Sequence, residues 1–259
     1  MVDLLFKGDP IGAIEGVLFD KDGTLSHSEP HLLNLAEARI NSAIELWVAG
    51  GRPESVCPPL RENLKRAFGV MPNGLDPAGT LAVASRHDNL TSMATVFCLM
   101  ECSWPAAHQM ATDSFNRVDR ALTQAPAIMN PLLPGSASLI QQLFTTGIKL
   151  AVISNDTEQG IQRFLEGHGL CQSFQTCWSA EHFPAKPNPE AVAQLCNKLD
   201  LDPKVCALIG DAETDLQMAA ASGIGLVIGY TGGWTSKPHL PSAALLIDDW
   251  NELSIQVGT

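Results

Sequence analysis

Three short apolar runs, separated by helical patterns, constrain the fold of this chain more than any other feature. They are rich in Val, Ile and Leu, which is typical of parallel strands buried on both faces. Together with two weaker runs that follow, the predicted strands cover residues 14–19, 149–153, 205–209, 225–228 and 244–247. The helical patterns between them cover residues 138–144, 157–165, 189–199 and 213–221. Because strands alternate with helices, the sequence predicts an α/β fold with a doubly wound, mostly parallel, Rossmann-like sheet.

A long helical interval lies between the first two predicted strands. From residue 26 to residue 130 no run is typical of a buried strand. Apolar residues recur at helical spacing over 32–47 and stop at the glycine pair 50–51, and residues 93–100 and 107–122 are also helical in pattern. An interval of this length is too long for a simple crossover between parallel strands.

The interval is therefore expected to be a separate domain. We predict a discontinuous α/β core of residues 1–25 and 131–259, with an inserted all-α cap domain at 26–130. The hinges are expected at 26–30 and in the proline-rich segment 126–134.

Composition narrows the class of partner. The 259 residues carry a formal net charge of −12, which argues against nucleic-acid binding, and no apolar run is long enough to cross a membrane. The N-terminus lacks the pattern of a signal peptide. Seven cysteines without a CxxC pair indicate reduced thiols and a cytoplasmic protein. They are Cys57, Cys98, Cys102, Cys171, Cys177, Cys196 and Cys206.

Polar residues follow the predicted strands at their carboxyl ends. Taken one at a time these are ordinary features, since acids, Ser-Asn pairs and Lys-Pro pairs are common in turns and helix caps. Their joint placement at the edge where open α/β sheets bind ligands is much less ordinary. In chain order they are Asp20, Asp22, Ser154, Asn155, Lys186, Asp211 and Asp215.

This set of residues suits phosphoryl transfer. A carboxylate can attack phosphorus and form an aspartyl-phosphate. Attack on an anionic phosphate needs a cation, and Mg²⁺ binds through one or two carboxylates together with phosphate oxygens. A hydroxyl and a lysine can bind the remaining phosphoryl oxygens, and a second acid can protonate the leaving group.

Four segments resemble the motifs of the haloacid dehalogenase (HAD) superfamily, specifically its phosphatases with a helical, type C1 cap. Residues 20–25, DKDGTL, are similar to the first motif. Ser154 matches the second motif, Lys186 the third, and residues 210–215, GDAETD, the fourth. Phosphoglycolate phosphatases are the nearest general resemblance.

The resemblance implies roles for the first motif. Asp20 would be the nucleophile and a Mg²⁺ ligand. Asp22 would be the general acid/base, and its main-chain carbonyl would also bind Mg²⁺. Thr24 would support the loop. An acid at Asp22 argues against dehalogenation, because the family's dehalogenases lack one there.

The resemblance also implies roles for the later motifs. Ser154 and the Asn155 backbone would bind the phosphoryl group, and Lys186 would neutralise charge on the nucleophile and the phosphate. Asp211 would be the third protein ligand of Mg²⁺, and Asp215 would lie behind it or bind through water.

The implied function is a Mg²⁺-dependent hydrolase that cleaves a phosphomonoester of a small metabolite through an aspartyl-phosphate. Two alternatives remain open at the level of the sequence. One is a phosphomutase of the β-phosphoglucomutase type, which shares the same motifs, and the other is a non-catalytic binding protein with this fold. The chain is expected to be a monomer or a homodimer.

Overall fold

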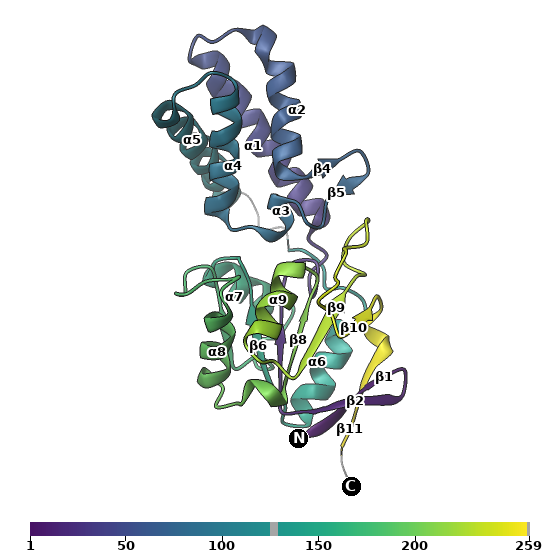
Figure 1. The fold of residues 1–259 in the computed structure, drawn as a ribbon. Coiled ribbons are helices and arrows are strands. Elements are labelled where there is room, and N and C mark those ends of the chain that lie inside the picture. Colours follow the sequence, from purple (N-terminus) through teal and green to yellow (C-terminus); the bar gives the residue numbers. More distant parts are fainter. Residues whose placement is uncertain (125–128, 258–259) are drawn as a thin grey trace. The chain divides into compact units, whose positions relative to one another are not determined.

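The computed structural model describes residues 1–124 and 129–257 (Figure 1). Its internal contacts divide the chain into two compact units. One unit comprises Met1–Ser28 together with Asn130–Thr259, and the other comprises Glu29–Met129. Part of the predicted hinge at 126–134, namely 126–128, lies outside the described residues.

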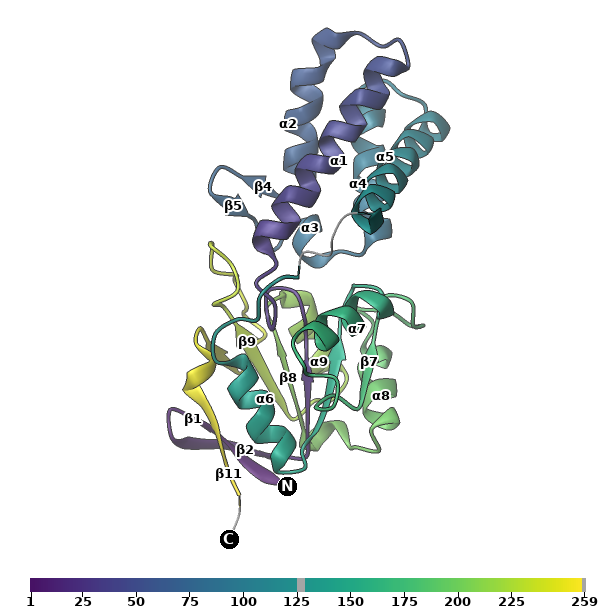
Figure 2. The same cartoon turned by 180° about the vertical axis from the view of Figure 1, so that it is seen from behind.

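A six-stranded sheet forms the centre of the first unit (Figures 1 and 2). Its strands are β3 (Gly16–Phe19), β6 (Lys149–Ile153), β7 (Thr176–Trp178), β8 (Cys206–Gly210), β9 (Leu226–Tyr230) and β10 (Leu245–Ile247). Their order is β10-β9-β8-β3-β6-β7, and every neighbouring pair is parallel. The predicted α/β class with a mostly parallel sheet is confirmed. The short edge strand β7 was not predicted.

Helices cover both faces of this sheet. They are α6 (Ser136–Thr145), α7 (Glu158–Gly167), α8 (Pro189–Lys198) and α9 (Glu213–Ala221). Successive side chains of β3 point to opposite faces, as in any strand. Val17 and Phe19 pack in a cluster with residues of α6 and α7, whereas Leu18 packs with residues of α8 and α9. The sheet is therefore doubly wound, as expected.

The predicted strand at 14–19 starts too early, because only Gly16–Phe19 form β3 and Ile14 is the last residue of a strand in another sheet. β2 (Asp9–Ile14) belongs to a three-stranded antiparallel sheet of order β11-β1-β2, which the sequence did not reveal. Its other members are β1 (Val2–Phe6) and β11 (Leu253–Gln256). Glu15 lies between the two sheets and hydrogen-bonds through its backbone to Val205 and Lys149. Short 3₁₀ turns at Pro203–Val205 and Trp250–Glu252 precede β8 and β11.

The second unit is helical, as expected for the insert. Its helices are α1 (Glu29–Ala49), α2 (Cys57–Phe68), α3 (Thr80–Val83), α4 (Arg86–Leu99) and α5 (Trp104–Gln124), with a 3₁₀ turn at Glu54–Val56. Buried apolar side chains hold them together, and the rings of Trp47 and Phe97 stack with centroids 6.3 Å apart. The insert is not entirely α-helical, because β4 (Val70–Met71) and β5 (Gly74–Leu75) form a small hairpin.

Two expectations from composition can be compared with this fold. All seven cysteines are free in the structure. Among residues 1–124 and 129–257, no helix combines the length and hydrophobicity that crossing a bilayer requires.

Candidate active site

Parallel pairing brings the first and fourth motifs together. Phe19 on β3 pairs with Val152 on β6 and with Ile209 on β8, so Asp20 emerges beside the ends of both strands. The Asp20 amide continues this register by donating to the Ile209 carbonyl at 2.9 Å. Asp20, Ser154 and Asp211 therefore leave three adjacent strands at the same edge of the sheet.

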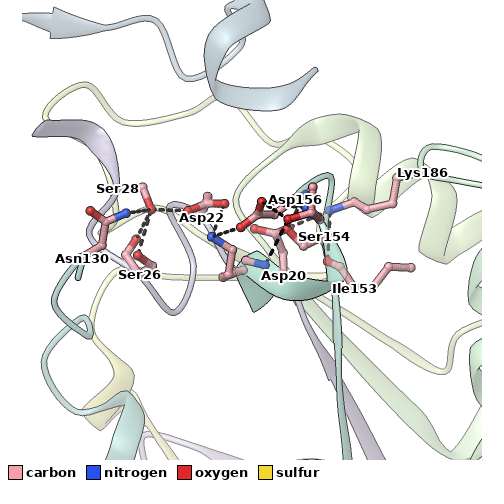
Figure 3. Close-up of polar contacts among 12 residues, drawn as sticks. Asp20, Asp22, Ser26, Ser28, Asn130, Ile153, Ser154, Asp156 and Lys186 are labelled. Carbon is pink, nitrogen blue, oxygen red and sulfur yellow. Dashed lines mark hydrogen bonds and ion pairs between the residues drawn. The ribbon is translucent and has the colours of Figure 1, made fainter. Parts of the chain in front are cut away.

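Lys186 joins this edge from the loop between β7 and α8. Its Nζ donates to Asp20 Oδ1 at 2.7 Å, to Asp215 Oδ2 at 2.6 Å and to the Ile153 carbonyl at 3.3 Å (Figure 3). Only 4% of the Lys186 side chain is exposed. Burial by itself would lower the pKa of Lys186, but the carboxylates of Asp20 and Asp215 outweigh it, so the pKa is raised and the lysine stays cationic.

Asp211 is buried against two side-chain donors. Thr24 Oγ1 donates to Asp211 Oδ1 at 2.6 Å, and Trp234 Nε1 donates to Asp211 Oδ2 at 2.6 Å. Burial and the nearby charge of Asp20 raise the pKa of Asp211 well above its usual range, against the effect of these two donors. Burial likewise raises the pKa of Asp215 to about 6, although Lys186 opposes the shift. A second positive charge at this position would relieve the repulsion between these carboxylates.

Asp22 belongs to a separate network. Its Oδ2 lies 2.6 Å from Lys21 Nζ, and its Oδ1 accepts a hydrogen bond from Ser28 Oγ (Figure 3). Ser28 Oγ in turn lies 2.9 Å from Ser26 Oγ. The Asp22 side chain is 26% exposed, compared with 9% for that of Asp20. Of the two motif carboxylates, Asp22 is therefore the one more open to solvent.

Ser154 and Asn155 follow β6 directly. Ser154 is 2% exposed, and its amide donates to the Trp178 carbonyl at 2.9 Å. Ser154 Oγ accepts from the Asp156 amide at 3.1 Å, which bends the chain toward the start of α7. The structure thus places Ser154 and Asn155 at the same sheet edge as Asp20.

Four residues of these networks were not singled out from the sequence: Lys21, Ser28, Asp156 and Trp234. A signal existed for two of them. Lys21 lies inside the first motif, close to the end of a predicted buried strand, and a buried ammonium group needs a partner of opposite charge. Trp234 follows the predicted strand at 225–228, and the loop after that strand leaves the sheet at the same edge.

The carboxylates fit a Mg²⁺ ion by their chemistry. The carboxylates of Asp20 and Asp211 and the main-chain carbonyl of Asp22 offer the hard oxygen donors that Mg²⁺ prefers, and a cation there would oppose the rise in the pKa of Asp211 that burial and the charge of Asp20 cause. In the orientations seen, however, the carboxylate oxygens of Asp20 and Asp211 bond to Lys186, Thr24 and Trp234. Accordingly, the described residues contain no preformed group of three or more His, Cys, Asp or Glu side chains arranged around one ion.

Two cavities of about 390 Å³ each lie along α5 in the helical unit. Arg120 and Gln124 line both of them. None of the predicted site residues lines either cavity, so they contribute nothing to the constellation at the sheet edge.

The family model of haloacid dehalogenase-like hydrolases matches residues 14–223. Curated relatives include a phosphoglycolate phosphatase of Salmonella typhimurium, 25% identical over 96% of this chain and 95% of that protein. Another is a phosphoglycolate phosphatase of Cereibacter sphaeroides, 25% identical over 86% of this chain and 88% of that protein.

Solved structures share the fold. A predicted phosphoglycolate phosphatase from Haemophilus somnus superposes with a TM-score of 0.65 at 22% identity, covering 92% of this chain and 95% of that one. A putative β-phosphoglucomutase from Thermotoga maritima superposes with a TM-score of 0.56 at 18% identity, covering 92% of this chain and 96% of that one. The chain belongs to the haloacid dehalogenase-like hydrolase family and is an enzyme of that family, as its motifs predicted.

Proposed function

We propose that this enzyme is a Mg²⁺-dependent phosphatase that hydrolyses the phosphomonoester of a small metabolite through an aspartyl-phosphate on Asp20. The observation that carries the proposal is the separation of the two motif carboxylates. Asp20 is buried and paired with Lys186 at 2.7 Å, whereas Asp22 is partly exposed and held by other groups. One carboxylate is thus suited to attack and the other to proton transfer.

The first step follows from these positions. A carboxylate oxygen of Asp20 attacks phosphorus, and the bond from phosphorus to the leaving-group oxygen breaks. Asp22 donates its proton to that oxygen as it departs. Lys186 offsets negative charge on Asp20 and the phosphoryl group, and the Ser154 hydroxyl and Asn155 backbone bind phosphoryl oxygens. Water then attacks the phosphorus, Asp22 takes up its proton, and Asp20 is released.

The proposed Mg²⁺ ligands are Asp20, the main-chain carbonyl of Asp22, and Asp211, with Asp215 behind them. When bound, the ion would supply positive charge against the phosphate and its nucleophile. Asp215 is already bonded to Lys186 at 2.6 Å, so its suggested role is to orient this lysine.

Phosphoglycolate is the first substrate to test, because the curated relatives that span nearly the whole chain carry that name. We also infer a cytoplasmic enzyme, which the seven free cysteines support.

The experiment measures phosphate release from phosphoglycolate and from p-nitrophenyl phosphate, with Mg²⁺ and with a chelator. Asp20→Asn keeps the size of the side chain but removes the nucleophilic carboxylate, and it is expected to lower kcat by at least about 1,000-fold. The chelator is expected to abolish turnover. A folded Asp20→Asn variant with the wild-type rate, or full activity in the chelator, would overturn the proposal.

A further inference from the structure

Lys21, which stands between the two motif carboxylates in the sequence, is a buried cation. It is 5% exposed, although lysine is among the residues that are least often buried. Its Nζ lies 2.6 Å from Asp22 Oδ2 and 3.2 Å from Asp156 Oδ2. It also lies 5.6 Å from the centre of the Phe164 ring. A buried lysine with two carboxylate partners is held in one place and keeps its charge.

Asp156 is itself held firmly. Its amide donates to Ser154 Oγ at 3.1 Å, and its carbonyl accepts from the Ala180 amide at 2.9 Å. Its Oδ1 accepts from the Thr157 amide at 2.7 Å, at the N-cap of α7. The other oxygen, Oδ2, faces Lys21. Asp156 therefore fixes the lysine from the loop that follows β6.

Each motif carboxylate thus has a lysine of its own. Lys186 pairs with Asp20 and Asp215, and Lys21 pairs with Asp22 and Asp156. The two lysines are not interchangeable, because they approach from different segments of the chain. Lys21 Nζ contacts Oδ2 of Asp22 and Ser28 Oγ donates to its Oδ1, so both oxygens of that carboxylate are held.

We propose that Lys21, oriented by Asp156, is a positioning residue that holds the Asp22 carboxyl group where it can reach the leaving-group oxygen. The inference rests on the proposed function, in which Asp22 gives its proton to that oxygen while the bond to phosphorus breaks. Proton transfer depends on placement within hydrogen-bond reach. A displaced Asp22 therefore slows the first step, the release of the leaving group, only where that group needs the proton, whereas it slows the later attack of water alike for every substrate.

The test uses this dependence on the leaving group. Phosphoglycolate releases an alkoxide that needs a proton, whereas p-nitrophenyl phosphate releases a stable phenolate. Lys21→Met keeps the length of the side chain but removes the ion pairs. The rates compared are those of leaving-group release in a single turnover, which report the first step alone. We expect Lys21→Met to lower the rate of glycolate release about 10- to 100-fold, within the range of general acid catalysis, and that of p-nitrophenolate release less than about threefold.

Asp156→Asn is also expected to slow the reaction of phosphoglycolate more than that of p-nitrophenyl phosphate, but by a smaller factor than Lys21→Met does. Because Asp156 acts through Lys21, the double variant should be no slower than Lys21→Met. Lys149→Met is the matched control. The Lys149 amine bonds the backbone carbonyl of Leu199 at 2.5 Å, at the amino end of β6, and both rates should stay at the wild-type level.

The outcomes separate this inference from the proposed function. If wild type hydrolyses neither compound, the proposed function fails. If wild type hydrolyses both compounds, a folded Lys21→Met that slows the release of the two leaving groups equally, or slows neither, refutes the positioning role. If Lys21→Met does not fold, Asp156→Asn decides alone, and equal losses on the two substrates refute the role.

Discussion

At the residue scale, Asp211 shows how a buried carboxylate can be prepared for a cation. Each of its oxygens accepts one hydrogen bond, from Thr24 and from Trp234, both at 2.6 Å. These bonds orient the carboxylate but leave its charge uncompensated, and burial together with Asp20 raises its pKa well above the usual range. Trp234 is thus tied to the proposed metal site through Asp211.

Replacing Trp234 by Phe is expected to weaken Mg²⁺ binding about 10- to 100-fold, since groups that orient a metal ligand typically contribute that much. Calorimetric titration of the protein with Mg²⁺ measures this without relying on turnover. Trp104→Phe is the control, because Trp104 is half exposed on α5 and its loss should leave the affinity unchanged. An unchanged affinity in Trp234→Phe would contradict the prediction.

Tyr230 is the single tyrosine of the chain. It is 2% exposed and stacks on Trp250 with ring centroids 4.8 Å apart. Burial, helped by the charges of Asp249 and Asp248, raises the pKa of Tyr230 from 10.0 to about 12. The folded protein therefore keeps a proton that the unfolded chain loses between these values. Its contribution to stability is complete below pH 10 and declines as pH rises through this window.

Two measurements follow for Tyr230. The near-ultraviolet absorbance of tyrosinate should be absent in the native protein at pH 10, yet half developed in urea at the same pH. The free energy of unfolding should fall above that pH, and less so in Tyr230→Phe. Because no other tyrosine contributes, a native tyrosinate signal at pH 10 would show that the raised pKa is wrong.

At the element scale, the loop between β9 and β10 packs directly against the first motif. Gly233 lies so close to Gly23 that a Cβ there would overlap the Gly23 carbonyl. Gly23 has φ of +81°, and a Cβ at this position would overlap Asp211 and the Trp234 ring. Two glycines facing each other thus allow the indole to reach Asp211.

Gly233→Ala is therefore expected to push this loop away from the motif. The overlap with backbone should reduce the free energy of unfolding by about 1–3 kcal/mol, as for other overpacked sites. It should also weaken Mg²⁺ binding at least as much as Trp234→Phe does. Denaturant unfolding and calorimetry measure the two effects. Gly12→Ala, where the nearest atom would lie 3.9 Å away, should change neither.

The parallel strands could be predicted from the sequence because they are buried on both faces and therefore continuously apolar. The same property concealed the break at Glu15. Ile14 directly before it and Gly16–Phe19 directly after it are all buried, so composition does not mark where the chain changes sheets. β11 escaped prediction because it is short and pairs with β1, which is far away in the chain. β1 also pairs with the neighbouring β2, but neither of these two strands is continuously buried.

Part of the candidate site could likewise be predicted from the sequence, and part could not. Asp20, Asp22, Ser154, Lys186 and Asp211 could be predicted, because each follows a strand or lies in a recognisable motif. Their partners could not be, since contacts such as the one between Lys21 and Asp156 join loops of different strands. Spacing along the chain carries no information about which side chains meet across such a distance.

At the scale of the whole molecule, the two segments by which the chain leaves the first unit and returns to it are hydrogen-bonded to each other. The Leu133 amide donates to the Leu25 carbonyl at 2.8 Å, and the His27 amide donates to the Pro131 carbonyl at 2.9 Å. Ser26 also bridges Leu132 in antiparallel fashion. These bonds join the two ends of the long insertion directly after the first motif.

The three-stranded sheet has a mechanical consequence. β1 and β11 are antiparallel, and Asp3 pairs with Gln256 while Phe6 pairs with Leu253. A force that pulls residues 3 and 256 apart therefore acts at one end of the ladder. Ladder hydrogen bonds run perpendicular to antiparallel strands, so this force acts along them, and they would break one after another from that end. The sheet that joins the two ends of the described chain is thus stable at rest but weak under tension along that direction.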